Sequence, residues 1–343
     1  MYFDDVEKIH ALDQDGMIEK IRDLTKQVQI SWSFVQQQQK FDFSHVKHIF
    51  LSGGTIQSNT IDILRVMITE KCSVELSFHE NEKLPFWCQG KDNLLLLVVD
   101  HDTAEEMTGL LEQGIEKDCS IFILFADQRI KNNFLTKSIA HWVLPGHKFD
   151  RTTIGFDTFI FYGILYKLGL SPDISQNISN LKLNLETTIQ HIDVSVPSAL
   201  NPAKRLAGQM VGRWIKIVAG GVMLPIANRW SDQINQSAKT LSNSENIFHL
   251  AHQSLSGFYN PENVAQQSMV VFLKSSFNEK KIEWMIERAK EELMCNGIGT
   301  DSYCARGEDL LSHIWTTILF GDFLAYYLAI AYECDPTPIA TLS

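Results

Sequence analysis

Two stretches of the sequence decide the fold, and the first reads His48-Ile-Phe-Leu-Ser-Gly-Gly-Thr55. The second reads Trp214-Ile-Lys-Ile-Val-Ala-Gly-Gly221. In each, an apolar run ends in two glycines, which is typical of a buried strand that turns into a helix. Each is followed by a second apolar run, at 94–99 or 269–273, of the kind found in parallel sheets covered on both faces. The repeat predicts an α/β chain with two doubly wound parallel-sheet domains related by internal duplication.

The length of the chain also favours two domains. Its 343 residues exceed one ordinary core and suit two domains of roughly 150 residues each. Prolines at Pro172, Pro197 and Pro202 mark a linker between them. The predicted division is an N-terminal domain at 1–170, a linker at 171–202 and a C-terminal domain at 203–343.

One apolar segment near the end of the chain could be mistaken for a membrane span. Residues 315–332 are almost wholly apolar, but Asp322 lies in their middle and the segment is short for a span. We interpret 315–332 as a buried C-terminal helix and expect no membrane partner. Two accounts of the apolar helix 310–332 stay open: burial within its own domain, or a place in a dimer interface. The N-terminus is acidic and lacks the apolar core of a signal peptide, so we expect a cytoplasmic protein.

Composition excludes other classes of function. The formal net charge is −11, whereas nucleic-acid binding needs clustered Lys and Arg, so no nucleic-acid partner is expected. Six cysteines are scattered without a C-x-x-C pair, which gives no sign of structural zinc. We therefore predict neither a metal nor another cofactor.

The first glycine turn carries candidate ligand-binding groups. Backbone N–H groups, hydroxyls and the positive end of a helix are the parts of an anion site, and phosphate is the usual ligand. The same residues could equally cap the helix with no ligand. The candidate residues are Ser52, Gly53, Gly54, Thr55, Gln57 and Ser58.

A second polar turn follows the apolar run at 94–99. Asp100, Asp102, Glu105 and Glu106 crowd the start of the next helix, where carboxylates satisfy the helix end by themselves. They would also repel a phosphate dianion. A metal held by Asp100, His101 and Asp102 is an alternative, but adjacent residues seldom converge on one ion.

In the C-terminal half of the chain, we also predict a short strand at 246–249.

Five different short motifs follow one another along the chain: SGGTIQS at 52–58, VDHDTAE at 99–105, RWSDQINQSAK at 229–239, HQSLSG at 252–257 and DPTP at 335–338. This series resembles the bifunctional phosphoglucose/phosphomannose isomerases, which are built from two sugar isomerase (SIS) domains. Their corresponding segments read S-G-M-G-G-S-G, S-Y-S-G-N-T-x-E, R-W-K-N-x-x-N-E-N-A-K, H-N-x-x-x-G and D-P-x-P.

The resemblance implies a reaction and residues to perform it. The reaction is aldose–ketose isomerisation of glucose 6-phosphate or mannose 6-phosphate to fructose 6-phosphate through a cis-enediol. His252 matches the histidine that opens the sugar ring, and Arg151 matches the arginine beside the enediolate. Thr103 and the first turn match substrate-binding positions. The family also implies a homodimer with a sugar phosphate as its small-molecule partner.

The sequence departs from the family at the residue that moves the proton. Gln236 stands where the family has its glutamate base, and an amide has no useful basicity. Glu245, nine residues later, is a possible substitute. Three readings stay open: an isomerase with a rearranged site, a non-catalytic sugar-phosphate binder, and a scaffold protein whose site has decayed.

Overall fold

The computed structural model describes residues 3–53, 58–69, 72, 74–79, 83–134 and 139–339. Their contacts form two compact units. The N-terminal sheet unit is Lys26–Ser175, and the C-terminal sheet unit is Met1–Thr25 with Gln176–Ser343. Residues 3–25 thus group with the C-terminal sheet unit by their contacts.

The stretch predicted to be a linker is largely helical. Helix α8 (Ser175–Ile192) fills most of 171–202, and α9 (Pro202–Met210) begins at its end. Buried Ile178, Leu181 and Leu185 follow helical spacing along α8, so the helix has an apolar face to pack against its unit.

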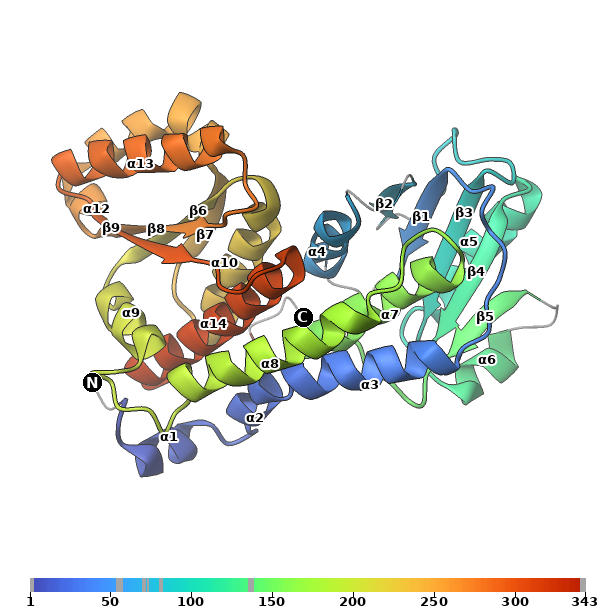
Figure 1. Cartoon of the computed structure of the whole chain (residues 1–343), viewed down its shortest axis with the longest axis horizontal. Coiled ribbons are helices and arrows are strands. Elements are labelled where there is room, and N and C mark those ends of the chain that lie inside the picture. The colour runs from blue at the N-terminus through green and yellow to red at the C-terminus, as the bar shows by residue number, and fades with distance from the viewer. Residues whose placement is uncertain are drawn as a thin grey trace. The chain divides into compact units, whose positions relative to one another are not determined.

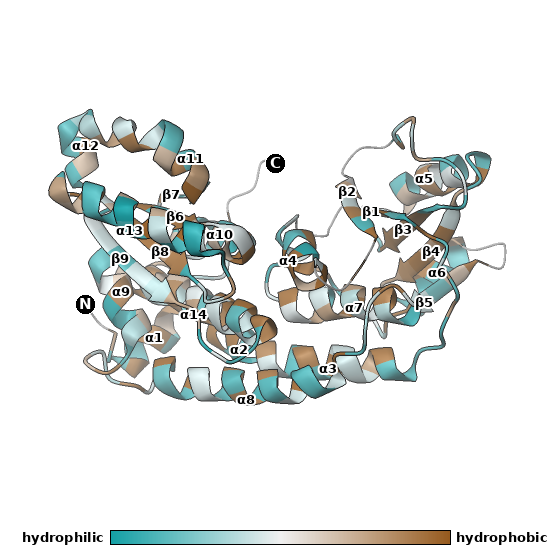
Figure 2. Cartoon of the chain, turned by 45° about the horizontal axis from the view of Figure 1, so that its top comes forward, coloured by the Kyte–Doolittle hydropathy of each residue, from teal (hydrophilic) through white to brown (hydrophobic). Residues whose placement is uncertain are grey.

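The N-terminal sheet unit is a five-stranded parallel sheet in the order β2-β1-β3-β4-β5 (Figure 1). Every residue of β3 is buried, which accounts for its unbroken apolar run. Figure 2 shows this strand in brown. The elements are α3 (Leu24–Gln37), β1 (His48–Ser52), α4 (Ser58–Ile68), β2 (Glu75–His79), β3 (Asn93–Val99), α5 (Ala104–Glu116), β4 (Ser120–Phe125), α6 (Gln128–Phe134), β5 (Ala140–Val143) and α7 (Ile154–Lys167).

The C-terminal sheet unit repeats this topology with four parallel strands in the order β7-β6-β8-β9. The elements besides α8 and α9 are α1 (Val6–Leu12), α2 (Met17–Arg22), β6 (Trp214–Ala219), η1 (Gly221–Met223), α10 (Leu224–Ala238), β7 (Ser242–Asn246), α11 (Ile247–His249), η2 (Leu250–Ser254), η3 (Leu255–Tyr259), α12 (Glu262–Gln266), β8 (Ser268–Lys274), α13 (Lys280–Cys295), β9 (Gly299–Cys304) and α14 (Leu310–Ala331).

The strand predicted at 246–249 is wrong. Strand β7 ends at Asn246, whose side-chain oxygen accepts a hydrogen bond from the Phe248 N–H at 3.0 Å and so starts α11.

The second glycine turn is as expected. Gly221 has φ +54°, and a Cβ there would lie 2.6 Å from Asn278 Oδ1, so the position requires glycine.

Helix α14 is long and apolar enough to span a membrane, but 89% of its apolar window is buried inside the protein. It packs against α9 and α10 of its own unit. Asp322, in its middle, pairs with Arg229 of α10 at 2.7 Å. The charge inside this apolar helix therefore has a buried partner, and the interpretation of 315–332 as a buried helix is confirmed.

In both sheets the strand before the glycine turn is flanked by the next two strands. Strand β1 lies between β2 and β3, and β6 lies between β7 and β8. The connections therefore leave in opposite directions, and ligands of such sheets bind at the carboxyl ends of these strands.

Candidate functional site

The first turn begins at the carboxyl end of β1. Ser52 is the last residue of the strand and is buried, as is Gly53. Helix α4 starts at the exposed Ser58 and continues through the buried Asn59 and Thr60. The other candidates in this turn, Gly54, Thr55 and Gln57, lie outside the described residues.

In the second turn, the carboxylate of Asp100 accepts the hydrogen bonds of the turn's own N–H and hydroxyl groups. Asp100 Oδ1 accepts hydrogen bonds from the N–H groups of Asp102 and Thr103, each at 3.0 Å. It also accepts one from the Thr103 hydroxyl at 2.8 Å. The Thr103 oxygen in turn accepts from the Asp100 N–H at 3.3 Å. Asp100 thus accepts from the N–H groups of the turn before α5, whereas no side chain caps the helix itself, so the prediction that carboxylates satisfy the helix end is not confirmed. The turn donors that a bound anion could use already have an acceptor.

The surroundings of this turn add further negative charge. A hollow of about 340 Å³ beside it is lined by Asp100, His101 and Glu105, among others. Nε2 of His101 lies 3.0 Å from Asp127 Oδ2. Among the residues that the structure describes, no cluster of His, Cys, Asp and Glu could hold a metal ion.

Arg151 is buried in the turn before α7. The same region contains a buried acid–histidine pair, in which His147 Nε2 lies 2.7 Å from Asp157 Oδ1. The Thr153 hydroxyl donates to Asp157 Oδ2 at 2.8 Å. Burial raises the pKa of Asp157 to about 6, although His147 and Thr153 oppose the rise. The segment around Arg151 therefore contains a carboxyl group that titrates near neutrality.

Gln236 lies near the end of α10. Its Oε1 atom is buried and has no hydrogen-bond partner among the described residues. An amide cannot take up the proton that aldose–ketose isomerisation moves between carbons. The position can accept a hydrogen bond but cannot act as the base.

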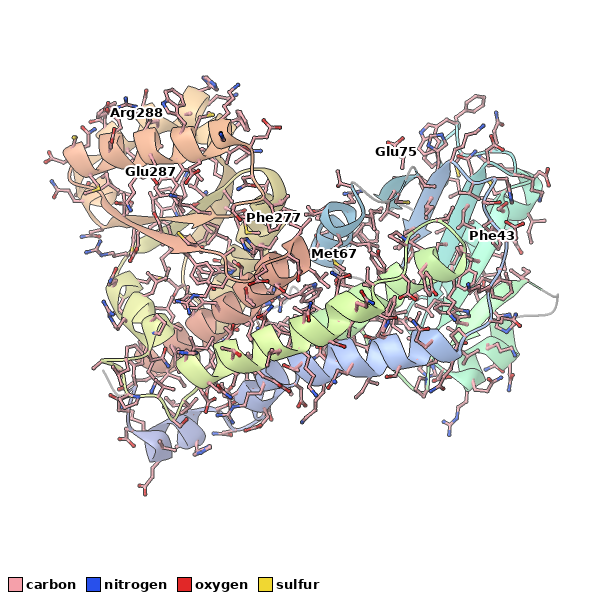
Figure 3. The ribbon with its side chains drawn as sticks, in the orientation of Figure 1. Phe43, Met67, Glu75, Phe277, Glu287 and Arg288 are labelled. Carbon is pink, nitrogen blue, oxygen red and sulfur yellow. The ribbon has the colours of Figure 1, made fainter. Side chains whose placement is uncertain are left out.

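His252 is exposed and lies in η2, a π-helical turn. It lines a hollow of about 650 Å³ with Ala251, Leu255 and residues of α13 that include Trp284 and Arg288. Arg288, labelled in Figure 3, comes from this helix. Gln236 does not line this hollow.

Glu245 is a poor substitute for the missing base. Its Oε2 accepts from Lys216 Nζ at 2.7 Å, and its Oε1 accepts from His249 Nδ1 at 3.1 Å and from the Ser254 hydroxyl. Burial raises the pKa of Glu245, but these donors outweigh burial and hold the pKa below its usual value. Sequence reasoning missed Lys216, although a lysine inside an apolar strand was a visible signal.

The predicted site residues divide between the two units. Ser52, Thr103 and Arg151 belong to the N-terminal sheet unit, and Gln236 and His252 to the C-terminal one. Within the first unit, the ends of β1 and β3 are neighbours in the sheet, which brings Ser52 and the Asp100 turn to the same edge.

Comparison with known proteins matches most of the C-terminal sheet unit to a known domain. A sequence model of the bacterial phospho-glucose isomerase C-terminal SIS domain matches residues 199–343. A bifunctional phosphoglucose/phosphomannose isomerase from Caldicellulosiruptor bescii is 23% identical over 291 residues, which cover 84% of each chain. One from Aquifex aeolicus is 20% identical over 253 residues, 74% of each chain.

Solved structures share the fold. The C-terminal domain of glucosamine-fructose-6-phosphate aminotransferase from Francisella tularensis has a TM-score of 0.67 at 12% identity, covering 94% of this chain and 99% of its own. A glucose-6-phosphate isomerase like protein from Thermus thermophilus has a TM-score of 0.55 at 17% identity, covering 96% and 93%. With the ordered motifs and the duplicated sheets, these similarities show an SIS domain of the bacterial phospho-glucose isomerase type at residues 199–343 and a distant similarity of most of the chain to bifunctional phosphoglucose/phosphomannose isomerases.

Proposed function

We propose that this member of the phosphosugar isomerase family has weak or lost aldose–ketose isomerase activity. The reaction in question is the interconversion of glucose 6-phosphate or mannose 6-phosphate with fructose 6-phosphate. The observation that carries the proposal is the Asp100 carboxylate, which accepts the hydrogen bonds of the second turn. A phosphate at this turn would have to displace a bonded carboxylate and approach its negative charge.

The replacement of the base supports the same conclusion. Proton transfer by a positioned base contributes typically about 10²–10⁴-fold to rate, and Gln236 cannot provide it. Glu245 does not restore it, because three donors keep this carboxylate ionised and engaged. Arg151 and His252 could still stabilise charge and open a ring, but neither replaces the base.

A second candidate is a non-catalytic sugar-phosphate binder. The feature in its favour is the beginning of the first turn, where Ser52 and Gly53 are buried beside the start of α4. Binding needs no base, so this candidate tolerates Gln236. A scaffold role is the third reading, in which neither turn binds a ligand.

Four proteins test the proposal: the wild type, Gln236→Glu, Asp100→Ser and the double variant. Formation of glucose 6-phosphate from fructose 6-phosphate is followed with a coupled dehydrogenase, and fructose 6-phosphate binding by calorimetry. We expect the double variant to turn over at least about 100-fold faster than the wild type, because it regains both a base and an open turn. Asp100→Ser alone should bind fructose 6-phosphate more tightly without turnover.

The matched control is Asp102→Ser, which removes the same charge from the same turn but leaves the Asp100 hydrogen bonds in place. Equal gains in affinity from both variants would show that charge alone matters, and that occupancy of the turn does not. Wild-type turnover equal to that of the double variant would overturn the proposal. Wild-type binding without turnover would favour the second candidate.

A further inference from the structure

An ion pair lies beneath the segment that carries His252. Lys216 of β6 and Glu245 of β7 meet at 2.7 Å, with 10% and 11% of their side chains exposed. Glu245 is paired in register with Val218, and Val218 belongs to the apolar cluster packed against α13. Since Lys216 and Val218 are two residues apart on one strand, both charged side chains face the α13 side of the sheet.

The same carboxylate is bonded to both ends of the segment around His252. Its Oε1 accepts from His249, the last residue of α11, and from Ser254, the last residue of η2. His252 lies between these two donors. Single π-helical turns such as η2 are rare and occur frequently at functional sites.

Other contacts attach this segment to the sheet. The Lys216 ammonium lies 5.5 Å from the centre of the Phe258 ring in η3. Ile247, Leu250 and Phe258 belong to the apolar cluster that includes α13. Between these buried anchors, His252 is exposed over the hollow beside Trp284.

The start of α11 does not need Glu245. Asn246 already caps it by accepting from the Phe248 N–H. A buried ion pair is also weak evidence for stability, because well-packed apolar residues often do as well in its place. The particular property of Glu245 is that one group joins the sheet to both flanks of His252.

We infer that Glu245, held by Lys216, is a positioning residue that fixes the π-helical turn and with it the direction of the His252 ring. This inference rests on the proposed function, since it concerns the histidine that the family uses to open the sugar ring. Glu245 itself does not contact substrate. Its role is to hold the segment 247–259 in one conformation.

Hydrogen exchange measured by mass spectrometry tests directly whether Glu245 holds the segment 247–259 in one conformation. In Glu245→Gln, the charge is lost and an amide NH₂ must face either Lys216 or the donors His249 and Ser254. Amides of 247–259 should exchange at least about 10-fold faster than in the wild type, while β8 stays protected. The matched control is Ser244→Ala, whose hydroxyl bonds to Asn228 of α10 on the other side of β7. It should leave 247–259 unchanged.

The direction of the His252 ring needs its own measurement. In protein labelled with ¹³C-histidine, the His252 ring signal is identified by its loss in His252→Gln. Glu245→Gln should move this signal toward the position of an unstructured histidine, while the signal of the exposed His191 on α8 stays in place. Lys216→Arg keeps the cation and should retain the wild-type position, whereas Lys216→Met should not.

Activity distinguishes this inference from the proposed function. In the background of the double variant Gln236→Glu with Asp100→Ser, adding Glu245→Gln should lower kcat and leave KM unchanged. If that double variant shows no activity, the proposed function is in doubt, while exchange and ring signals still decide the role of Glu245. Unchanged exchange at 247–259 together with an unmoved His252 signal in a folded Glu245→Gln variant would overturn the inference.

Discussion

Two carboxylates at the carboxyl ends of equivalent sheets are used in different ways. Asp100 follows β3 and is bonded to groups two and three residues away in its own turn. Glu245 lies near the end of β7 and is bonded to groups 4, 9 and 29 residues away. The first closes a turn, and the second joins a strand, a lysine and a histidine-bearing segment.

The difference shows that a carboxylate can either occupy the donors of an anion-binding turn or hold a neighbouring segment in place. Asp100 is satisfied by backbone donors that a phosphate would otherwise use, so its presence opposes an anion. Glu245 is satisfied by side chains, one of them a buried cation, so its removal leaves that cation without a partner. We therefore expect substitutions at Glu245 to affect folding and substitutions at Asp100 to affect binding.

The largest expected effect is that of Glu245→Ala. Removing one partner of a buried pair leaves an uncompensated charge, so the free energy of unfolding should fall by about 3 kcal/mol. Urea unfolding measures it. The double change Lys216→Met with Glu245→Leu should recover most of the loss, because apolar residues then fill the space. A loss of unfolding free energy below about 1 kcal/mol for Glu245→Ala would contradict the contrast, because Glu245 would then contribute no more to stability than Asp100.

Asp157 sharpens the comparison, because it is partnered by a histidine instead of a lysine. Its pKa is raised from 3.8 to about 6, so ionisation is harder in the folded state than in the unfolded one. Its contribution to stability is therefore greatest below pH 4 and is lost as the pH rises to about 6. The loss amounts to about 3 kcal/mol. Glu245, with a lowered pKa, acts oppositely and loses its contribution as the pH falls below its usual range.

The measurement for Asp157 is the unfolding free energy of the wild type and of Asp157→Asn between pH 4 and 6. Asparagine keeps one acceptor for His147 or Thr153 but does not titrate. The stability of the variant relative to the wild type should rise from pH 4 to pH 6, by up to the amount above. Parallel curves for the two proteins would contradict the assignment.

Much of the fold follows from local pattern. The apolar runs before Gly53 and Gly220 predicted β1 and β6, and the unbroken run at 94–99 predicted a fully buried strand. Strand β9 was not predicted, because Gly299–Cys304 is polar and has no apolar run. Helix α8 could have been found, because Ile178, Leu181 and Leu185 have helical spacing, but the prolines around it suggested a linker.

The candidate site was less predictable than the fold. Some of its contacts join residues close in the sequence, and others join residues that only the register of the strands brings together. The filling of the second turn depends on neighbouring residues, so the acidic sequence at 100–106 indicated carboxylates there, although no side chain caps the helix itself. The pair of Lys216 and Glu245 depends on the register of β6 and β7, which the sequence does not state. His252 was named by resemblance, whereas the hydrogen bonds from Glu245 to both flanks of His252 could be found only in the structure.

The smallest expected effect comes from Asp100 and tests whether its role is local. Asp100→Ala should cost about 1 kcal/mol of unfolding free energy, the usual net contribution of a lost hydrogen bond. Asp100→Asn keeps the Oδ1 acceptor and should stay within about 0.5 kcal/mol of the wild type, as should the exposed control Asp102→Ala. If Asp100→Asn is as costly as Asp100→Ala, the charge stabilises the turn and the contrast with Glu245 fails. If it is tolerated while Glu245→Gln is not, the same change of carboxylate to amide separates local hydrogen bonds within a turn from contacts between residues far apart in the sequence.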